Sequence, residues 1–436
     1  MKTLICIPCL LTGGTEIQTL NTVQALVQAG HEVTVACYFE HTPDMVARYR
    51  KAGAEVILFS PECVRVGGYK SILFLYKHLR RAVKAVRPDV VHVQYMAPGA
   101  TVILLLWLMG VKNIIATAHT AADIYRDLRL IHFLQRRCLR AFTCITERAE
   151  RSFFGSSQLY SPDLVLGRRN HFTIYNSLPV QLGGSCNEDA DENENSFISL
   201  SSVDNKINAK IKINTMEQNL DAFTHAQACA SHPEGDSNSQ TTANSQQLTT
   251  NSQEPNTKLT LGVVSRIEPI KGMDLVVPAF AEVLKAYPET QLLIVGDGSL
   301  RASMEEQATQ LACADHIRFV GRQPQEELSQ WYSQMDIVLM PSRSEGFGLT
   351  AIEAMAHGCV MVASDVGGLP EVVRDGICGL LHRTEDVADM AAKISTLIGD
   401  EALYTQLRAQ SLVEVGKYSF ERYSALMNDL YNKLGK

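Results

Sequence analysis

Two glutamates lie eight residues apart in the stretch Pro341–Gly358, PSRSEGFGLTAIEAMAHG. The stretch follows the apolar run DIVLM, which is typical of a buried strand. Gly346–Gly348 supply a flexible turn into a helix expected to open near Leu349, where unpaired N–H groups suit a phosphate or a sugar hydroxyl. Glu345 precedes the turn and Glu353 lies one helical turn in, so both can accept hydrogen bonds from hydroxyls, as on a hexose and a ribose. Each glutamate taken singly fits equally well a helix-terminal charge or a solvated face.

A second stretch, VVSRIEPIKGMD, places two cations after another apolar run. Arg266 follows the run by one residue, Lys271 comes five residues later, and Gly272 is expected to open a helix. Two cations at the carboxyl end of a strand suit a diphosphate, although two ordinary surface cations would give the same pattern. The turn in LIVGDGSLR is not a dinucleotide fingerprint, because Arg301 stands at the third glycine position. The turn in SDVGGLPEVV adds another glycine pair after a strand.

The first residues, CIPCLLTGGTEIQ, combine a C-x-x-C pair with the glycines Gly13 and Gly14. A redox cysteine pair usually opens a helix, and here the helix is expected only after the glycines, so the cysteine pair is interpreted as incidental. Thr15 and Gln18 form a capping-box pattern that predicts a helix start near Glu16. We therefore expect Gly13, Gly14 and Glu16 to form a bare loop that faces a substrate cleft.

The chain alternates short apolar runs with helical patterns, first through residues 1–180 and again through residues 259–400. This pattern predicts an α/β protein with two Rossmann-like, doubly wound domains that face each other across a cleft. Seven strands are expected in the first domain and six in the second. The expected divisions are a domain at 1–182, a polar and largely disordered insertion at 183–257, a domain at 258–418, and a C-terminal helix at 419–436 that packs back on the first domain.

Charge is distributed unevenly along the chain. The net charge is −7 overall, yet residues 1–180 carry 21 Lys and Arg against 12 Asp and Glu, and residues 259–436 carry 15 against 24. The acidic total and the lack of a recognised module disfavour nucleic acid as a partner. The basic helical patterns at 76–87 and 125–140 suit contact with an anionic membrane surface, or an ordinary solvated helix face.

The cysteine pattern and the lack of signal-peptide features favour a cytoplasmic protein, and the basic helical patterns add an expected peripheral contact with the inner face of a membrane. The 11 cysteines are an odd number without metal-ligand spacing, which is typical of a reduced compartment. Met1–Leu11 lacks the features of a signal peptide. The longest apolar run, residues 101–111, would span roughly half of a bilayer core, so we expect a buried helix there.

Taken together, these motifs resemble one family. The stretch Leu261–Leu381 resembles the nucleotide-sugar half of the retaining glycosyltransferases of family 4, which have the two-domain GT-B fold. The Arg…Lys-Gly, Gly-Asp-Gly, Glu-Gly-Phe-Gly…Glu and Gly-Gly-Leu-Pro-Glu motifs occur in the family's order and spacing. The first half is similar more loosely, through Gly13–Gly14, AGHEVTV, VVHVQ, His119 and TIYNSLP. The long connection at 183–257 departs from the family.

The resemblance implies roles for particular residues. Arg266 and Lys271 would hold the donor diphosphate, Glu345 would bind the transferred sugar, Glu353 would bind the ribose, and His119 would lie near the reacting sugar. His119 and Glu345 are the expected catalytic pair. The remaining expected donor contacts are Gly14, Gly346, Phe347, Gly348 and Leu349. No metal and no other cofactor is expected, since the chain lacks an Asp-x-Asp motif and cations with helix N-termini can neutralise a diphosphate.

The resemblance therefore predicts a hexosyltransferase that moves a sugar from a UDP- or GDP-sugar to a glycan or lipid-linked acceptor with retention of configuration, in surface polysaccharide or glycoconjugate synthesis. The two domains would close for catalysis. Two alternatives remain. A nucleotide-sugar epimerase of the same fold would consume the donor without an acceptor, and a non-catalytic subunit would bind the donor without turnover.

Overall fold

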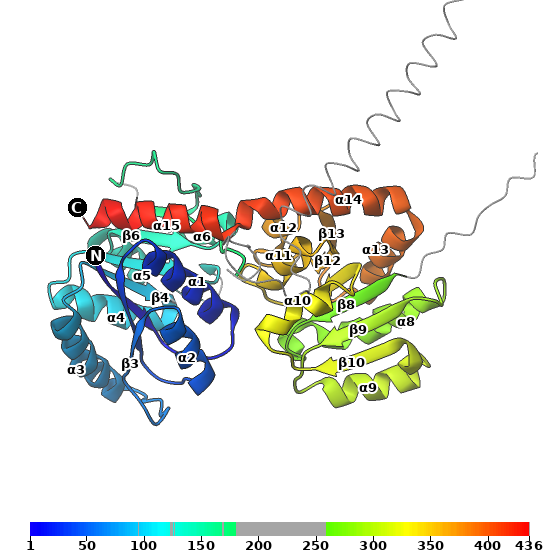
Figure 1. Ribbon diagram of the computed structural model, residues 1–436, viewed down its shortest axis with the longest axis horizontal. Coiled ribbons are helices and arrows are strands. Elements are labelled where there is room, and N and C mark those ends of the chain that lie inside the picture. Colours follow the sequence, from blue (N-terminus) through cyan, green and yellow to red (C-terminus); the bar gives the residue numbers. More distant parts are fainter. Residues whose placement is uncertain (95, 123–124, 126, 168–169, 180–258, 436) are drawn as a thin grey trace, which may run out of the picture. The chain divides into compact units, whose positions relative to one another are not determined.

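The structure is a computed structural model that describes residues 1–94, 96–122, 125, 127–167, 170–179 and 259–435. Residues 1–182 and 257–436 form one compact unit. The predicted insertion at 183–257 lies outside the described residues. The described elements make two α/β domains, each built on a parallel sheet (Figure 1). The predicted fold class is confirmed.

The first domain has a seven-stranded sheet in the order β3-β2-β1-β4-β5-β6-β7. Its strands are β1 Lys2–Ile7, β2 Glu32–Cys37, β3 Glu55–Leu58, β4 Val90–Gln94, β5 Ile114–Ala118, β6 Ala141–Cys144 and β7 His171–Thr173. Its helices are α1 Gly14–Gln28, α2 Pro43–Lys51, α3 Tyr69–Val86, α4 Met96–Leu108, α5 Arg129–Arg137 and α6 Glu147–Phe154.

The second domain repeats the same strand order in six strands, β10-β9-β8-β11-β12-β13. These are β8 Thr260–Val264, β9 Gln291–Val295, β10 Ile317–Gly321, β11 Ile337–Met340, β12 Val360–Ser364 and β13 Gly379–His382. The helices are α8 Val276–Leu284, α9 Arg301–Gln310, α10 Leu328–Tyr332, α11 Leu349–Ala356, α12 Leu369–Val372, α13 Val387–Gly399, α14 Glu401–Glu414 and α15 Phe420–Leu434. All thirteen predicted strands are present, seven in the first domain and six in the second.

Alternation along the strands explains why each sheet is covered on both faces. In β1, Leu4 and Cys6 pack in one core cluster with α3 to α6, whereas Ile5 and Ile7 pack in the opposite cluster with α1 and α2. Such strands are apolar at nearly every position because neither face meets water. The side chains that can reach a ligand are therefore those where each strand ends.

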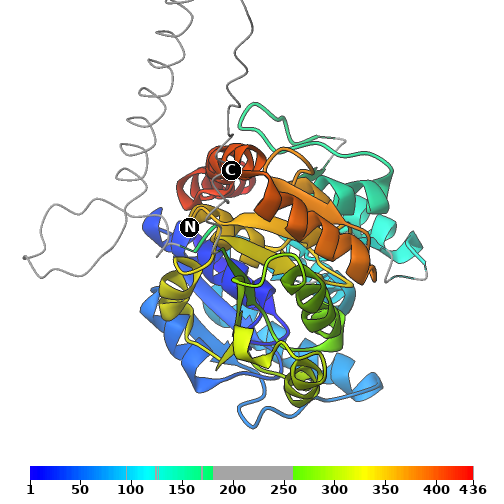
Figure 2. The ribbon, with the colours of Figure 1, turned by 90° about the vertical axis from the view of Figure 1, so that its right-hand side faces the viewer.

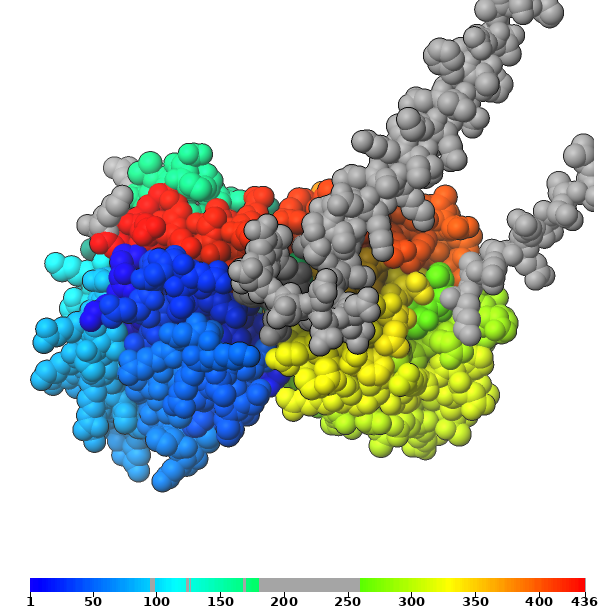
Figure 3. Space-filling view, viewed as in Figure 1, coloured from blue at the N-terminus to red at the C-terminus, as the bar shows by residue number. Residues whose placement is uncertain are grey.

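The C-terminal helix α15 completes the second face of the first sheet. Tyr423, Met427 and Leu430 are buried in the same cluster as α1, and Tyr423 shares a hydrogen bond of 2.7 Å with Thr22. In Figures 1 and 2 this helix, in red, lies along the first domain, and Figure 3 shows the red and orange helices running from one domain to the other. The chain therefore passes between the domains twice, near 176–179 and near 415–419.

Two predicted helix starts are wrong, for identifiable reasons. Helix α1 begins at Gly14 rather than near Glu16, because Gly13 serves as the N-cap with an extended backbone and no side-chain cap. Gln18 does not complete a capping box; its side chain accepts a hydrogen bond from Ser177 N at 3.1 Å. The chain makes one short 3-10 turn at Pro269–Lys271 and another at Met273–Leu275, and the α-helix begins only at Val276 rather than at Gly272.

Candidate active site

A cleft of about 850 Å³ lies between the carboxyl edges of the two sheets. It is lined by residues that follow strands of both domains, as expected for parallel α/β sheets. Eleven of the twelve predicted site residues line it, namely Gly13, Gly14, His119, Arg266, Lys271, Glu345, Gly346, Phe347, Gly348, Leu349 and Glu353. Sequence segments more than 300 residues apart thus meet at one place.

Glu16 is the exception among the predicted residues. It lies in the first turn of α1 but does not line the cleft, and only 4% of it is exposed. Its carboxylate accepts a hydrogen bond from Cys9 Sγ at 3.1 Å, and burial raises its pKa. The helix starts two residues earlier than predicted and Glu16 is buried, so this segment lines the cleft with Leu11, Thr12, Gly13, Gly14, Thr15 and Ile17 instead.

The second domain contributes an ion pair to the cleft. Lys271 Nζ lies 2.7 Å from Glu345 Oε2, with 20% and 14% of the two side chains exposed. The two residues were predicted to bind different parts of a donor, a diphosphate and a sugar. The two side chains are in contact, so a diphosphate that bound Lys271 would share it with Glu345.

Arg343 fixes the two loops that carry this pair. Its guanidinium donates to both carboxylate oxygens of Asp274, at 2.7 and 2.8 Å, and also contacts Glu385. Its backbone N–H donates to Ile270 O at 3.0 Å. These contacts join the segment between β8 and α8 to the loop after β11, and the guanidinium lowers the pKa of Asp274. Arg343 was not among the predicted residues, because a lone arginine before Glu345 has no distinctive spacing.

Glu353, which the family resemblance implies would bind a ribose, lines the cleft and is buried. Its two carboxylate oxygens accept hydrogen bonds from Gln325 Nε2 at 3.0 Å and from Tyr332 OH at 2.9 Å. Burial raises its pKa to about 7, although both hydrogen bonds oppose the rise. Gln325 also lines the cleft, so a ribose that binds Glu353 would meet Gln325 as well.

The first domain contributes a neutral histidine. His119 follows β5 and is 6% exposed, and its Nε2 lies 2.7 Å from Gln94 Oε1. Since a carbonyl oxygen only accepts, Nε2 carries the hydrogen. Burial lowers the His119 pKa to about 3, so the ring stays neutral in the physiological range. Gln94 ends strand β4, and only the neighbouring positions of β4 and β5 in the sheet reveal its link to His119.

The two domains touch at the loop between Glu345 and Gly348. A side chain at Gly346 would collide with the carbonyl oxygen of His119. Glycine is therefore required there for the loop that carries Glu345 to approach the backbone of His119 in the other domain. In the motif Glu-Gly-Phe-Gly, the first glycine is therefore needed for close packing between the domains, and not only to expose backbone N–H groups.

Family models match both halves of the chain. The model described as Glycosyltransferase Family 4 matches residues 12–158, and the model described as Glycosyl transferases group 1 matches residues 244–412. The chain belongs to glycosyltransferase family 4. The resemblance drawn from the sequence motifs is confirmed.

Relatives named as glycosyltransferases match part of this chain. A D-inositol 3-phosphate glycosyltransferase of Nocardia farcinica is 37% identical over 179 residues, which are 38% of this chain and 40% of the relative. One of the same name from Actinosynnema mirum is 42% identical over 153 residues, 32% of this chain and 37% of the relative. The matched region thus spans about two fifths of the length of these relatives.

Solved structures show the GT-B fold over nearly the whole chain. HepE of Anabaena, crystallised with UDP, gives a TM-score of 0.68 at 15% identity and covers 99% of this chain and 100% of its own. The lipopolysaccharide outer core galactosyltransferase WaaB gives a TM-score of 0.64 at 14% identity, again with 99% and 100% covered. These likenesses concern the fold.

Within the described ranges, no three His, Cys, Asp or Glu side chains gather in a way that could hold a metal ion. None of the helices described here is both long and apolar enough to cross a membrane.

Proposed function

We propose that this protein is a glycosyltransferase that moves a sugar from a UDP- or GDP-sugar to a glycan or lipid-linked acceptor, with retention of anomeric configuration and without a metal. The observation that carries the proposal is the Lys271–Glu345 pair at the cleft, with Arg266 beside it and the neutral His119 opposite. Cations suit the diphosphate, and the carboxylate suits the hydroxyls of the sugar. The partial match to family 4 enzymes that act on D-inositol 3-phosphate supports the class of reaction.

In the proposed reaction the acceptor oxygen forms a bond to the anomeric carbon while the bond from that carbon to the diphosphate breaks. Arg266 and Lys271 would offset the negative charge that develops on the leaving nucleotide. The incoming hydroxyl and the leaving phosphate would lie on the same face of the sugar, and the hydroxyl proton would pass to the phosphate. His119, held neutral by burial, would contribute hydrogen bonding rather than a positive charge.

The first experiment is a screen of nucleotide-sugars for protection against thermal unfolding, because a ligand that binds the folded state stabilises it by mass action. The donor found in this way is then incubated with candidate acceptors, and glycosylated product is measured. Transfer that requires both donor and acceptor supports the proposal. Donor consumption without an acceptor would favour the epimerase, and donor binding without any turnover would favour a binding subunit.

The proposal includes an acceptor presented at an anionic membrane surface on the cytoplasmic side. Helix α3 buries Leu75, Leu79 and Ala82 and leaves Tyr69 and Leu73 80% and 70% exposed. Most of the exposed positions that follow on this helix are basic, namely Lys77, Arg80, Arg81 and Lys84. An apolar end beside a row of cations suits an interface where acyl chains lie beneath anionic headgroups. Flotation with phosphatidylglycerol vesicles and with phosphatidylcholine vesicles tests this contact, and equal binding to both would exclude the electrostatic part.

A further inference from the structure

The first turn of helix α6 in the first domain is bound by a carboxylate from the second domain. Glu147 N donates to Glu371 Oε2 at 2.8 Å, and Arg148 N donates to Glu371 Oε1. Ala149 N is bound within the first domain by Thr146 Oγ1 at 3.1 Å. The first three N–H groups of α6 are thus satisfied, two of them across the domain boundary.

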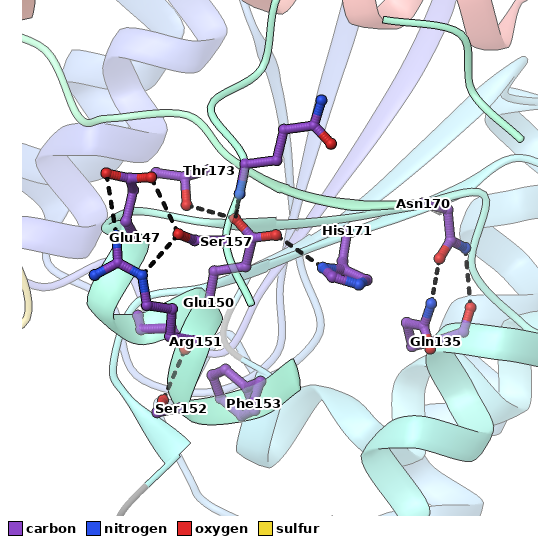
Figure 4. A network of polar contacts seen from close by, with 12 residues as sticks. Gln135, Glu147, Glu150, Arg151, Ser152, Phe153, Ser157, Asn170, His171 and Thr173 are labelled. Carbon is purple, nitrogen blue, oxygen red and sulfur yellow. Dashed lines mark hydrogen bonds and ion pairs between the residues drawn. The ribbon is translucent and has the colours of Figure 1, made fainter. Parts of the chain in front are cut away.

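Helix α6 is itself fixed to the first domain, as Figure 4 shows. The Glu150 carboxylate, whose side chain is 0% exposed, accepts from Gln158 N at 3.0 Å, from Thr173 Oγ1 at 2.8 Å, and contacts His171 Nδ1 at 2.8 Å. Phe153 is buried in the core beneath. Because α6 is fixed to the first domain in this way, a carboxylate that binds the N-terminus of α6 is linked to the first domain as a whole.

The acidic side chain of Glu147 does not bind the N-terminal N–H groups of α6, which Glu371 binds instead. Glu147 turns to Ser157 and Arg151, where its Oε1 accepts from Ser157 Oγ at 3.1 Å. Negative charge at a helix N-terminus is favourable because the unpaired N–H groups and the helix dipole point toward it. Burial raises the pKa of Glu371, and the two backbone N–H groups oppose that rise because they favour the ionised form.

The loop before Glu371 is packed on the other side against the sugar-binding loop. Gly368 N donates to Glu345 O at 3.0 Å. A side chain at Gly368 would collide with Gly346 O and with the Thr146 methyl group. The glycine thus allows three backbone segments to meet, from α6 through the Gly-Gly turn to Glu345.

Glu371 also lies beside both segments that connect the domains. Tyr418 OH donates to Glu371 O at 3.3 Å, and Leu178 N donates to Tyr418 O at 2.8 Å. Leu178 and Ile145 of the first domain are buried in a core cluster of the second domain. The contact at Glu371 is therefore next to the hinge, where a small displacement changes the angle between the domains.

We propose that Glu371 is a positioning residue that couples the two domains, and that its cap on α6 keeps the Glu345 loop aligned with His119. The coupling itself is independent of the sugar transferred, whereas its effect on catalysis rests on the proposed function. Glu371 touches no predicted donor contact with its side chain. Loss of the carboxylate should therefore leave nucleotide affinity unchanged and lower turnover.

Hydrogen exchange tests the coupling without any substrate. In the full chain with Glu371→Ala, the amides of Glu147 and Arg148 should exchange at least about fivefold faster than in the native protein, the loss expected for a helix cap. Formate at about 0.1 M should slow them again, because a small carboxylate can occupy the vacated helix terminus, whereas chloride at equal ionic strength should do so less. Glu401→Ala removes an exposed acid from the first turn of α14 and is the matched control.

Kinetics then test the alignment. Glu371→Ala should bind UDP or GDP with native affinity and show a kcat about tenfold lower, and formate should restore part of that loss. Glu371→Gln, which keeps one acceptor oxygen, should lie between the alanine variant and the native protein, and it decides the question if the alanine variant does not fold. Unchanged exchange at Glu147 and Arg148 would overturn the coupling. A native protein that neither binds nor transfers a nucleotide-sugar would overturn the proposed function and leave the exchange result to decide on Glu371.

Discussion

The two domains share one strand order, and the carboxyl edges of their sheets carry different chemistry. The second domain presents charge to the cleft, with Arg266, Lys271 and Glu345 following its strands. The first domain presents neutral groups, with His119 bonded to Gln94 and a loop of bare glycines. Outside the cleft the signs are unequal as well, because residues 1–180 are basic and residues 259–436 are acidic. One topology thus supports a charged edge that suits a diphosphate and a neutral edge that suits hydroxyl groups.

The charged edge should be the most sensitive to mutation. Lys271→Ala and Glu345→Ala are each expected to lower kcat about 10²- to 10³-fold, the effect of removing a charged group that acts on the transition state. The unfolding free energy should change by only about 1 kcal/mol, because both side chains are partly solvated. Lys285→Ala, which breaks the exposed pair with Glu282 in the same domain, is the control and should retain full activity. A Lys271→Ala variant that turns over at the native rate would show that the charged edge does not contribute to catalysis through Lys271.

Glu353 is a buried carboxyl within the charged edge, and its titration should be visible in stability. Its pKa is about 7 in the folded protein against 4.5 ordinarily, so the folded state holds the proton more tightly than the unfolded state. The stabilisation that follows is fully present below pH 4.5 and is lost as the pH rises to about 7, by up to about 3 kcal/mol. Denaturant melts of the ligand-free protein at several pH values measure it.

Glu353→Gln serves as the comparison for that titration. The amide cannot ionise, so the part of the pH dependence between pH 4.5 and 7 should disappear while the contacts to Tyr332 and Gln325 are partly kept. Nucleotide affinity should also fall several-fold, since a carboxylate accepts stronger hydrogen bonds from a ribose than an amide does. An identical pH dependence in both proteins would contradict the assignment.

The neutral edge should respond more weakly. His119→Ala is expected to reduce transfer about tenfold, the value of one uncharged hydrogen bond. Because the His119 pKa is about 3, the native rate should show no step from this histidine between pH 5 and 8. The same shift means that the unfolded state binds more protons below pH 6.5, so stability should fall as the pH drops from there. If the transfer rate of the native protein changed stepwise near pH 6.5 and that step were absent in His119→Ala, His119 would become charged there and this prediction would be wrong.

The smallest effects concern the outer surfaces. Lys77→Ala, Arg80→Ala and Arg81→Ala on α3 should each weaken binding to phosphatidylglycerol vesicles by about 1 kcal/mol at low salt. Lys285→Ala on the acidic domain should change vesicle binding little, and it is the matched control. Equal effects of the α3 and Lys285 variants would mean that the basic character of the first domain does not direct membrane contact.

Sequence patterns anticipated much of this arrangement. Each predicted strand was recognisable because a parallel strand covered on both faces is apolar at almost every position. Lys271 and Glu345 could be predicted because each follows a strand, and parallel strands end at one edge. Their direct contact could not, since it depends on two loops that Arg343 joins across 69 residues of chain.

The parts that escaped prediction depend on contacts distant in sequence. Gln325 and Tyr332 support Glu353 from a neighbouring helix, and neither has a spacing that marks it. The start of α1 was misplaced because Gln18, read as a local cap, instead binds Ser177 at the domain connection. Glu371 belongs to a recognised motif, and only the folded chain shows that its partner is a helix of the other domain.

The two connections between the domains also determine how far each part of the cleft can travel. The two connections lie side by side, because Leu178 N donates a hydrogen bond to Tyr418 O. They therefore form a hinge between the domains. The ring centroids of Phe347 and Tyr418 are 5.5 Å apart, so Phe347 lies near the hinge. Arg322 follows the edge strand β10, at the opposite edge of the sheet from β13. For a given rotation about the hinge, the displacement of a residue grows with its distance from the hinge. A rotation about these connections would therefore displace the part of the cleft near Arg322 more than the part near Phe347, and it would break the hydrogen bond of 3.2 Å from Arg322 to Thr12 Oγ1.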